Sequence, residues 1–179
     1  MLKLNTLSGF GSGVSAAGGA SPTYGYFGSG ITSGSSTATD RITFATSTLA
    51  AHTDADQSYG AEADGDCSDA GSFGYGYFVA GYSSENVATT DRITFSTSTT
   101  AAHTDANAYT PRSPFSGNSD GTTYGYITES GLGVADADRI TFSTSVAAQN
   151  TDANLATTRR NTGSLSDGPT YGYTIGGIT

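Results

Sequence analysis

The tripeptide Tyr-Gly-Tyr occurs four times in this chain, and a second string, Asp-Arg-Ile-Thr-Phe, occurs three times between the copies. The first string begins at residues 24, 75, 124 and 171, and the second begins at residues 40, 91 and 138. Successive copies are 51, 49 and 47 residues apart for the first string, and 51 and 47 residues apart for the second. A period near fifty is typical of proteins built from repeated structural units, so the spacing predicts three similar units.

Each string alternates its side chains in the manner of a β-strand. Because successive side chains point to opposite faces of a sheet, Ile42 and Phe44 share one face, and Arg41 lies on the other. β-branched and aromatic residues with a period of two predict strands in every copy. The expected scaffold residues are the tyrosines of the first string and the isoleucine and phenylalanine of the second: Tyr24, Tyr26, Tyr75, Tyr77, Tyr124, Tyr126, Tyr171, Tyr173, Ile42, Phe44, Ile93, Phe95, Ile140 and Phe142.

Two further strands are expected in each unit, which gives an all-β fold of three four-stranded units. Third strands are expected near residues 50–54, 101–105 and 147–152, and fourth strands near residues 59–64, 114–118 and 161–165. A turn rich in Ser, Asp and Gly precedes each later Tyr-Gly-Tyr, at residues 68–69, 119–121 and 166–168, and such turns favour hairpins. Glycine between two tyrosines is costly in an isolated strand, so we expect another ring or backbone to pack closely there.

Composition restricts the functions that are expected. The 179 residues carry a net charge of −9 with one Lys and six Arg, whereas phosphate binding needs clustered cations, so no nucleic-acid partner is expected. No run of 18 apolar residues is present, so no membrane insertion is expected. Leu, Ile, Val and Phe number only 27, but eleven Tyr and eight Phe supply large apolar area for a core.

The chain divides into an N-terminal arm and a repeat domain. Residues 1–22 contain no continuous apolar segment, because Gly and Ser interrupt it, so they do not read as a secretory signal. They are expected to form a flexible arm whose function is docking to a partner. Residues 23–179 are expected to form the β-repeat domain. Its units span about residues 23–72, 73–121 and 122–168, with a closing strand at 169–179.

The strings TYGYFGSG and TDRITFATST, followed by a Ser-Asp-Gly turn that leads into TYGYI, resemble the kelch-like propeller repeats in virion proteins of marine and freshwater bacteriophages, including cyanophages. In that family an aromatic-Gly-aromatic strand ends in a pair of glycines, and an Asp-Arg-Ile strand follows. The resemblance covers about residues 20–179, with the glycine pair intact at Gly176-Gly177 and without the Trp common in kelch blades. It implies β-propeller-type blades and a virion or extracellular location.

Three blades are too few to close a ring, and the fourth Tyr-Gly-Tyr has no Asp-Arg-Ile-Thr-Phe partner. Unpaired sheet edges promote association, so we expect a homo-oligomer. The alternatives are a dimer that closes a six-bladed ring and a threefold arrangement along a fibre. Other expected partners are virion proteins that contact the N-terminal arm and a host-surface glycan.

The Asp-Arg pairs are the only repeated opposite charges, and adjacent strand residues cannot pair with each other because they point to opposite faces. They are expected to tie neighbouring units together through carboxylates or carbonyl groups, with a repeated sugar or anion site as the alternative. These inter-repeat polar residues are Asp40, Arg41, Asp91, Arg92, Asp138 and Arg139.

Candidates for chemistry are few. His52 and His103 occupy matching positions, and Gln149 is taken as the third copy, so a polar strand position is favoured over a metal or general-base site. The acidic run at residues 64–69 lacks the spacing of a calcium loop and is read as a solvated turn. Cys67 has no neighbouring base by spacing and excludes an intrachain disulfide, since it is the only cysteine. No catalytic residue, metal or cofactor is therefore expected.

Between the two strings lie segments that vary from unit to unit: ITSGSSTAT, YSSENVATT and ESGLGVADA. Loop variation on a constant scaffold is typical of binding surfaces, and also of loops that nothing constrains. The expected function is a non-enzymatic virion structural protein, such as a tail fibre, appendage or capsid decoration subunit, that contacts host-surface glycans. The alternative is a soluble multivalent lectin with one sugar site per blade.

Overall fold

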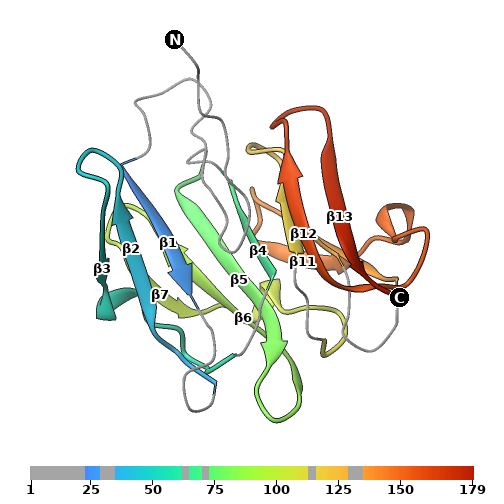
Figure 1. The fold of residues 1–179 in the computed structure, drawn as a ribbon, viewed down its shortest axis with the longest axis horizontal. Helices are drawn as coiled ribbons and strands as arrows, with labels where there is room; N and C mark the ends of the chain where they lie inside the picture. Colours follow the sequence, from blue (N-terminus) through green and yellow to red (C-terminus); the bar gives the residue numbers. More distant parts are fainter. Residues whose placement is uncertain (1–22, 29–34, 62–64, 70–72, 113–115, 129–134) are drawn as a thin grey trace.

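The computed structural model describes residues 23–28, 35–61, 65–69, 73–112, 116–128 and 135–179. Thirteen strands and three short 3-10 helices make up the secondary structure of these residues (Figure 1), which confirms the expected all-β class. The expected N-terminal arm, residues 1–22, lies outside the described residues.

The strands form four antiparallel sheets, which we number along the chain. Sheet 1 contains β1 (Tyr24–Gly28), β2 (Thr39–Thr43) and β3 (Thr48–Ala51). Sheet 2 contains β4 (Gly65–Ser68), β5 (Tyr75–Tyr82), β6 (Asn86–Thr94) and β7 (Thr99–Ala102). Sheet 3 contains β8 (Ser116–Ser119), β9 (Tyr124–Thr128), β10 (Ala137–Thr141) and β11 (Val146–Gln149). Sheet 4 is the hairpin of β12 (Arg160–Ser166) and β13 (Gly172–Ile178). In each sheet, strands that follow one another in sequence lie side by side.

Corresponding residues of sheets 1, 2 and 3 pair in the same register. The glycine of each Tyr-Gly-Tyr lies opposite the isoleucine of the next strand: Gly25 opposite Ile42, Gly76 opposite Ile93, and Gly125 opposite Ile140. The tight turn that follows holds a serine with a positive φ of 53° or 54° in all three sheets: Ser47, Ser98 and Ser145. A left-handed conformation is unfavourable for a residue with a side chain. Its recurrence at one position shows that the three turns share one backbone conformation.

One turn of 3-10 helix follows the last strand of sheets 1, 2 and 3 (β3, β7 and β11), at η1 (Thr53–Ala55), η2 (Thr104–Ala106) and η3 (Thr151–Ala153). The residue after each helix, Asp56, Asn107 or Asn154, accepts a hydrogen bond from a backbone N–H of β2, β6 or β10, the strand next to the last one, at 2.8, 2.8 and 2.9 Å. These side chains fold the connection back against its own sheet and fix where the chain leaves for the next one.

Every sheet has two different faces. We call the side that carries the two tyrosines of the first string the tyrosine face, and the side that carries the isoleucine and phenylalanine of the second string the isoleucine face. The tyrosine face of one sheet packs on the isoleucine face of the next. Tyr26 of sheet 1 lies against Phe95 beside sheet 2, Cys67 of sheet 2 against Gly125 of sheet 3, and Asn118 of sheet 3 against Gly172 of sheet 4. The sheets are therefore stacked in chain order, with sheets 1 and 4 on opposite sides of Figure 1.

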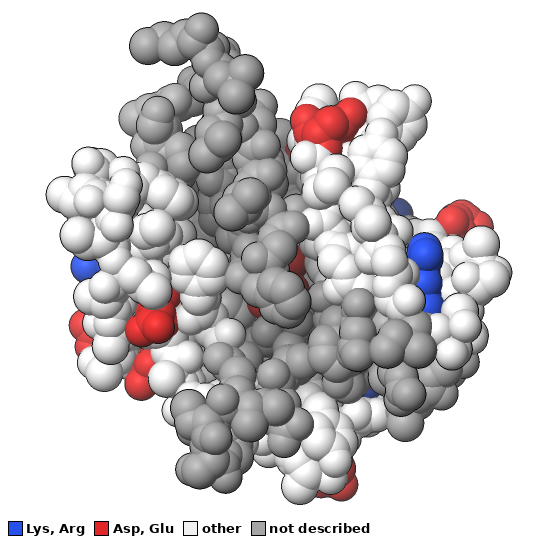
Figure 2. Space-filling view, viewed as in Figure 1, with Lys and Arg blue, Asp and Glu red and all other residues white. Residues whose placement is uncertain are grey.

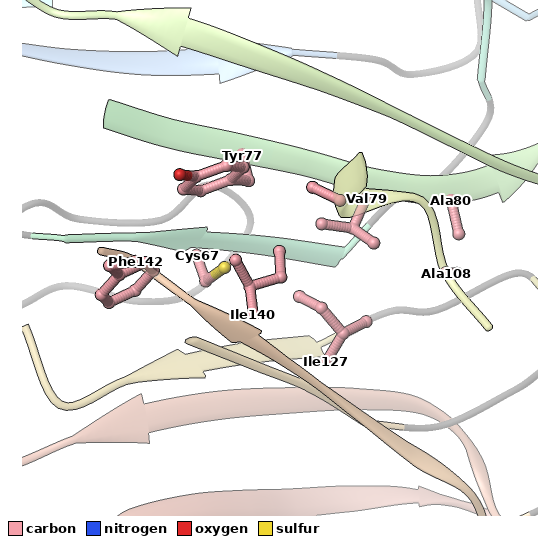
Figure 3. Packing of buried hydrophobic residues seen from close by; sticks show 9 residues of the cluster. Cys67, Tyr77, Val79, Ala80, Ala108, Ile127, Ile140 and Phe142 are labelled. Carbon is pink, nitrogen blue, oxygen red and sulfur yellow. The ribbon is translucent and has the colours of Figure 1, made fainter. Parts of the chain in front are cut away.

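The apolar core lies between the sheets. The larger cluster joins sheets 2 and 3, where Tyr77, Val79 and Cys67 face Ile127, Ile140 and Phe142 across the interface (Figure 3). A smaller cluster joins sheets 1 and 2 and contains Tyr26, Ala55, Phe78 and Ile93. Burying one Ile or Phe side chain contributes about 1.5–3 kcal/mol, so each of these buried side chains stabilises the contact between sheets.

Several glycines stand where another residue approaches the backbone closely, Gly76 and Gly117 among them. A Cβ atom on Gly76 would lie 3.0 Å from side-chain carbons of Ile93 and Phe95, which confirms that rings pack closely over the glycine of Tyr-Gly-Tyr. A Cβ atom on Gly117 would lie 1.9 Å from the carbonyl oxygen of Asp66. The backbones of β8 and β4, in adjacent sheets, therefore touch at this point.

Several predicted boundaries were wrong. The third strands end at Ala51, Ala102 and Gln149, because the Thr-Asp-Ala segments that follow them form 3-10 helices. The first of the predicted fourth strands, at residues 59–64, is instead β4, Gly65–Ser68. The second variable segment is mostly strand, since Tyr82 pairs with Asn86 and leaves only residues 83–85 as a loop.

The sheets also do not coincide with the predicted unit boundaries. The strand before each later Tyr-Gly-Tyr belongs to the sheet that follows it, so sheet 2 begins at Gly65 and sheet 3 begins at Ser116. Sheet 1 has three described strands and sheet 4 has two, and the described strands do not close into a ring.

Candidate functional site: the interfaces between sheets

Stacked aromatic rings occupy the same place in the first two interfaces. Tyr26 of sheet 1 stacks on Phe95 with a centroid distance of 6.1 Å and an interplanar angle of 15°. Tyr77 of sheet 2 stacks on Phe142 at 6.0 Å and 14°. Aromatic pairs of this kind contribute about 0.5–1.5 kcal/mol beyond the area that they bury. The second tyrosine of the first string thus joins each sheet to the phenylalanine of the following one.

The hydroxyl group of the same tyrosine fixes the register of the interface. The Tyr26 hydroxyl is hydrogen-bonded to Ser98 Oγ at 2.7 Å, and the Tyr77 hydroxyl to Ser145 Oγ at 2.8 Å. Both serines are the positive-φ residues of the turns described above. A single hydrogen bond contributes about 1 kcal/mol, less than the ring burial, but it is directional and therefore selects one alignment of the two sheets.

A histidine ring adds a second contact to each of these turns. The Nε2–H of His52 donates to the carbonyl oxygen of Ser98 at 3.0 Å, and the Nε2–H of His103 donates to that of Ser145 at 3.1 Å. Both histidines immediately precede a 3-10 helix, and Asn150 holds this position in the third copy. The sequence interpretation that placed Gln149 there was wrong, because Gln149 pairs with Asp138 as Ala102 pairs with Asp91.

The arginines of the second string lie over tyrosine rings of their own sheets. Arg41, Arg92 and Arg139 stand 4.3, 4.2 and 4.4 Å from the ring centroids of Tyr24, Tyr75 and Tyr124. Such cation–π contacts contribute about 0.5–1 kcal/mol at partly exposed sites. Arg92 also donates from Nη1 to Ser145 Oγ at 3.3 Å, so this guanidinium touches the next sheet as well.

The aspartates of the second string bind the connection that arrives from the preceding sheet. Asp91 accepts hydrogen bonds from the backbone N–H of Ser58 at 2.5 Å and from the Ser58 hydroxyl at 2.6 Å. Asp138 accepts one from the backbone N–H of Tyr109 at 2.9 Å. Ser58 and Tyr109 hold matching positions after η1 and η2, whereas Asp40 is exposed. In the second and third pairs the aspartate and the arginine therefore have separate partners.

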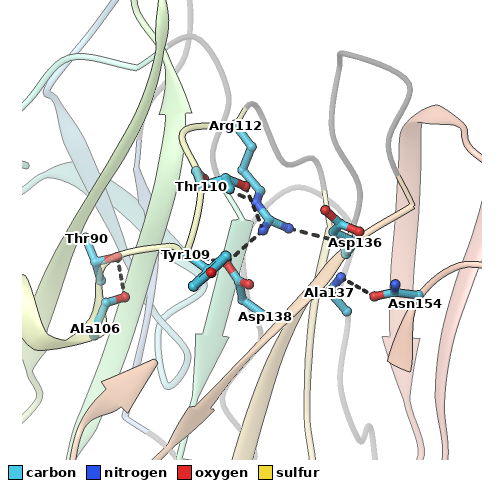
Figure 4. A network of polar contacts seen from close by, with 9 residues as sticks. All are labelled: Thr90, Ala106, Tyr109, Thr110, Arg112, Asp136, Ala137, Asp138 and Asn154. Atoms are coloured by element: carbon cyan, nitrogen blue, oxygen red, sulfur yellow. Dashed lines mark hydrogen bonds and ion pairs between the residues drawn. The ribbon is translucent and has the colours of Figure 1, made fainter. Parts of the chain in front are cut away.

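Asp138 also forms an ion pair with a residue of the connection that precedes its sheet. Its Oδ2 lies 3.0 Å from Nη2 of Arg112, and both side chains are almost completely buried. Arg112 donates further to the carbonyl oxygen of Asp136 at 3.1 Å and to Thr110 Oγ1 at 3.2 Å (Figure 4). Burial raises the pKa of Asp138, and the guanidinium and the Tyr109 N–H oppose that rise. Ala61 stands at the position of Arg112 in the preceding connection, as the matching bridges of the two residues show.

Cys67 and Asp69 have structural surroundings. Cys67 is buried, and burial together with Asp66 and Asp69 raises the pKa of its thiol far above the ordinary value, which suppresses the thiolate that a nucleophile requires. The Asp69 carboxylate accepts backbone N–H groups from Phe73 and Tyr75 at 2.9 and 3.0 Å. Asp120 and Asp167 cap the later turns in the same manner. Asp64 lies outside the described residues.

The scaffold residues on the two outer faces of the stack, Ile42, Phe44, Tyr171 and Tyr173, are more exposed than their counterparts. Ile93, Ile140 and Phe142 are buried and Phe95 is half-buried, whereas Ile42 is half-buried and Phe44 is exposed. Tyr26 and Tyr77 are buried, and Tyr24, Tyr75, Tyr124 and Tyr126 are half-buried, but Tyr171 and Tyr173 are exposed. The difference follows from position in the stack, because these residues lie on faces that no further described sheet covers.

Sequence reasoning missed several residues of the interfaces. Ser47, Ser98 and Ser145 each stand at the same distance after the second string. The presence of serine at this position in all three copies is the signal from which their role could have been predicted. Arg112 has no such signal, since its role depends on a single buried carboxylate in the next sheet.

Comparison with known protein families gives no match, and comparison with the curated proteins gives none either. Within the part of the chain that the structure describes, no helix is long and apolar enough to cross a membrane. The face in Figure 2 shows separate acidic and basic side chains on a largely uncharged described surface.

Proposed function

We propose that this protein is a non-enzymatic structural subunit of a bacteriophage virion, a tail fibre, appendage or capsid decoration protein built from three kelch-like units of the β-propeller type. The observation that carries the proposal is the repetition of one interface. The ring stack, the Tyr–Ser hydrogen bond and the His–carbonyl contact recur between sheets 1 and 2 and between sheets 2 and 3. The residue types that would serve as ligands or catalysts are used here as contacts between sheets.

The physical consequence of this design is rigidity along the stack. The two interfaces that join sheets 1, 2 and 3 combine apolar burial with directional hydrogen bonds, so these sheets have one preferred alignment. An acidic surface, with a net charge of −9, keeps such particles apart in solution. A stiff, acidic body suits a component exposed on the outside of a particle, and the resemblance of the repeated strings to phage virion repeats supports this role. In this proposal the N-terminal arm docks to another virion protein, and the chain self-associates.

The alternative function, a multivalent lectin, requires the same sugar site in every unit. Sugar sites are commonly built on exposed aromatic rings, and Tyr109 is 66% exposed. The matching positions after η1 and η3 are Ser58 and Ala156, so this aromatic platform is not repeated. The structural role is therefore the better supported of the two.

The experiment that tests the proposal is detection of the chain in purified particles. Virions are separated from lysate on a density gradient, and the protein is measured by mass spectrometry and by immunogold labelling. We expect a constant number of copies per particle, together with labelling on the particle exterior. Absence from gradient-purified particles would overturn the virion assignment, and a glycan array that shows one binding site per unit would replace it with the lectin.

A further inference from the structure

Exposed apolar side chains gather on the two end faces of the stack. Of the eleven large apolar residues that are exposed in the described chain, seven lie on these faces. The tyrosine face of sheet 4 carries Leu165, Tyr171, Tyr173 and Ile175, and the isoleucine face of sheet 1 carries Phe27, Phe44 and Leu49. Contiguous apolar patches of this kind on a soluble protein mark sites of association.

The two end faces are the two halves of an interface that the chain already forms internally. Tyr173 holds the position of Tyr26 and Tyr77, which stack on Phe95 and Phe142. Phe44 holds the position of those two phenylalanines, and it is 43% exposed whereas Phe142 is 1% exposed. Ser47 has the same positive φ as Ser98 and Ser145, yet it is exposed while they are buried beneath a tyrosine of the preceding sheet.

The neighbouring residues match in the same way. Ile175 holds the position of Val79, which packs against Ile127 in the core between sheets 2 and 3 (Figure 3). Phe27 holds the position of Ile127 and is 41% exposed, whereas Ile127 is fully buried. The tyrosine face of sheet 4 thus presents an aromatic ring and an aliphatic side chain two residues apart on one strand. Sheet 2 presents the same pair to the isoleucine face of sheet 3.

We propose that the tyrosine face of sheet 4 docks on the isoleucine face of sheet 1 in a second copy of this chain. Tyr173 stacks on the partner's Phe44 and hydrogen-bonds the partner's Ser47, and Ile175 packs on the partner's Phe27. The contact is head-to-tail, so it leaves one free end on each side and generates a closed ring or an open filament. This inference deepens the self-association part of the proposed function, because it names the surfaces and the partner.

The occupant is a second copy because the chain itself supplies both complementary surfaces. The interface continues the stack beyond sheet 4 with the same types of contact that join sheets 1 and 2. Two strands in sheet 4 suffice for the ring and hydroxyl contacts, since in the internal interfaces these come from β1 or β5 alone. A charged side chain at either Tyr173 or Phe44 would have to be buried without a partner, so it would block its own end.

The test uses the full chain and two complementary variants, Tyr173→Asp and Phe44→Asp. Light scattering after size-exclusion chromatography should give the wild type a mass above the 18.1 kDa of one chain. Each variant alone should be a monomer, because every copy lacks one of the two ends. An equimolar mixture should form a one-to-one dimer and stop there, since one partner keeps the sheet 4 face and the other keeps the sheet 1 face.

Tyr82→Asp, at an exposed tyrosine outside the end faces, is the matched control and should assemble like the wild type. Tyr173→Ser and Phe44→Ser repeat the test with smaller changes, and unchanged thermal unfolding shows that the variants are folded. A monomeric wild type, single variants that keep the wild-type mass, or a mixture that stays monomeric would each overturn the inference. None of these outcomes bears on the presence of the chain in virions, so the two proposals fail separately.

Discussion

The phenolic oxygen of Tyr77 in sheet 2 lies 2.8 Å from the Oγ atom of Ser145, in the turn between β10 and β11 of sheet 3. The serine has a φ of 54°, a conformation that costs free energy unless its surroundings stabilise it. His103 holds the carbonyl oxygen of the same residue at 3.1 Å. Two side chains of one sheet therefore hold one strained turn of the next, and this arrangement aligns the two sheets.

Replacement of Tyr77 by Phe should remove the hydrogen bond while keeping the ring stack. We expect a loss of about 1 kcal/mol in the free energy of unfolding at pH 7. Burial raises the pKa of Tyr77 to about 12, above the value of about 10 for an unfolded tyrosine. Since only the unfolded state loses the proton between these values, wild-type stability from this group is complete below pH 10 and falls as the pH rises towards 12.

The difference between wild type and Tyr77→Phe should therefore shrink by about 1 kcal/mol between pH 7 and pH 11, because the phenylalanine variant lacks this titration. Urea unfolding at the two pH values measures both effects. Tyr109→Phe, at an exposed tyrosine, is the control and should stay within about 0.5 kcal/mol of the wild type at pH 7. A gap that is the same at both pH values would contradict the assignment.

Replacement of Asp138 by Asn should be strongly destabilising. The variant leaves the Arg112 guanidinium buried without its carboxylate, which costs about 3–5 kcal/mol. Asp40→Asn alters the matching residue of sheet 1, which is exposed, and should change the free energy of unfolding by less than about 0.5 kcal/mol. Urea unfolding of the two variants at pH 7 makes the comparison, and equal effects would show that the ion pair is not essential.

The double variant Arg112→Met with Asp138→Asn should recover part of this loss, because no charge then remains buried. If the double variant is as unstable as the sum of the single ones, the two residues do not act as a pair. The cycle therefore separates the ion pair from the packing of the arginine side chain.

Replacement of Gly117 by Ala should push sheets 2 and 3 apart. The new methyl group would lie 1.9 Å from the Asp66 carbonyl oxygen, and a backbone atom cannot rotate away as a side chain does. We expect a loss of about 3 kcal/mol or more, as for severe overpacking. Gly163→Ala, in β12, is the control, since nothing lies within 4 Å of the position of its Cβ atom. Similar melting temperatures for both variants would refute the close approach of β8 and β4.

The Cys67 thiol should be unreactive in the folded protein. It is 1% exposed, and burial raises its pKa far above the ordinary value, so the thiolate is scarce at pH 8. A disulfide reagent should label it only at the rate of unfolding and immediately in denaturant. Rapid labelling under native conditions would show that the interface between sheets 2 and 3 opens readily.

The strands of the two repeated strings were predictable because their side chains alternate with a strict period and carry β-branched and aromatic residues. The glycine between tyrosines could be interpreted for the same reason, since only close packing explains it. The strand β4 was misplaced because Gly65 and Asp66 belong to a segment without apolar alternation, and its pairing with β5 is not visible in the sequence. The histidine position was misassigned because Gln149 and Asn150 are both polar, and only strand pairing tells them apart.

The contact partners of the inter-sheet residues could not be predicted from the amino-acid sequence. Arg92 and Asp91 are adjacent in sequence, but Arg92 contacts Ser145 of sheet 3, whereas Asp91 binds Ser58 in the connection that arrives from sheet 1. Which of them faces which neighbour depends on the direction in which the sheets stack, and no local pattern encodes that direction. The exposed state of Tyr173 and Phe44 likewise follows from their being at the ends of the stack.

The offset between the repeated strings and the sheets has a consequence for how such a chain can change in length. Because sheets 2, 3 and 4 each begin with the strand that precedes their Tyr-Gly-Tyr, insertion of one further period would add one complete sheet and one further interface. Both terminal surfaces would be preserved. Recombination between copies could therefore lengthen or shorten the body in steps of one sheet without the invention of a new contact.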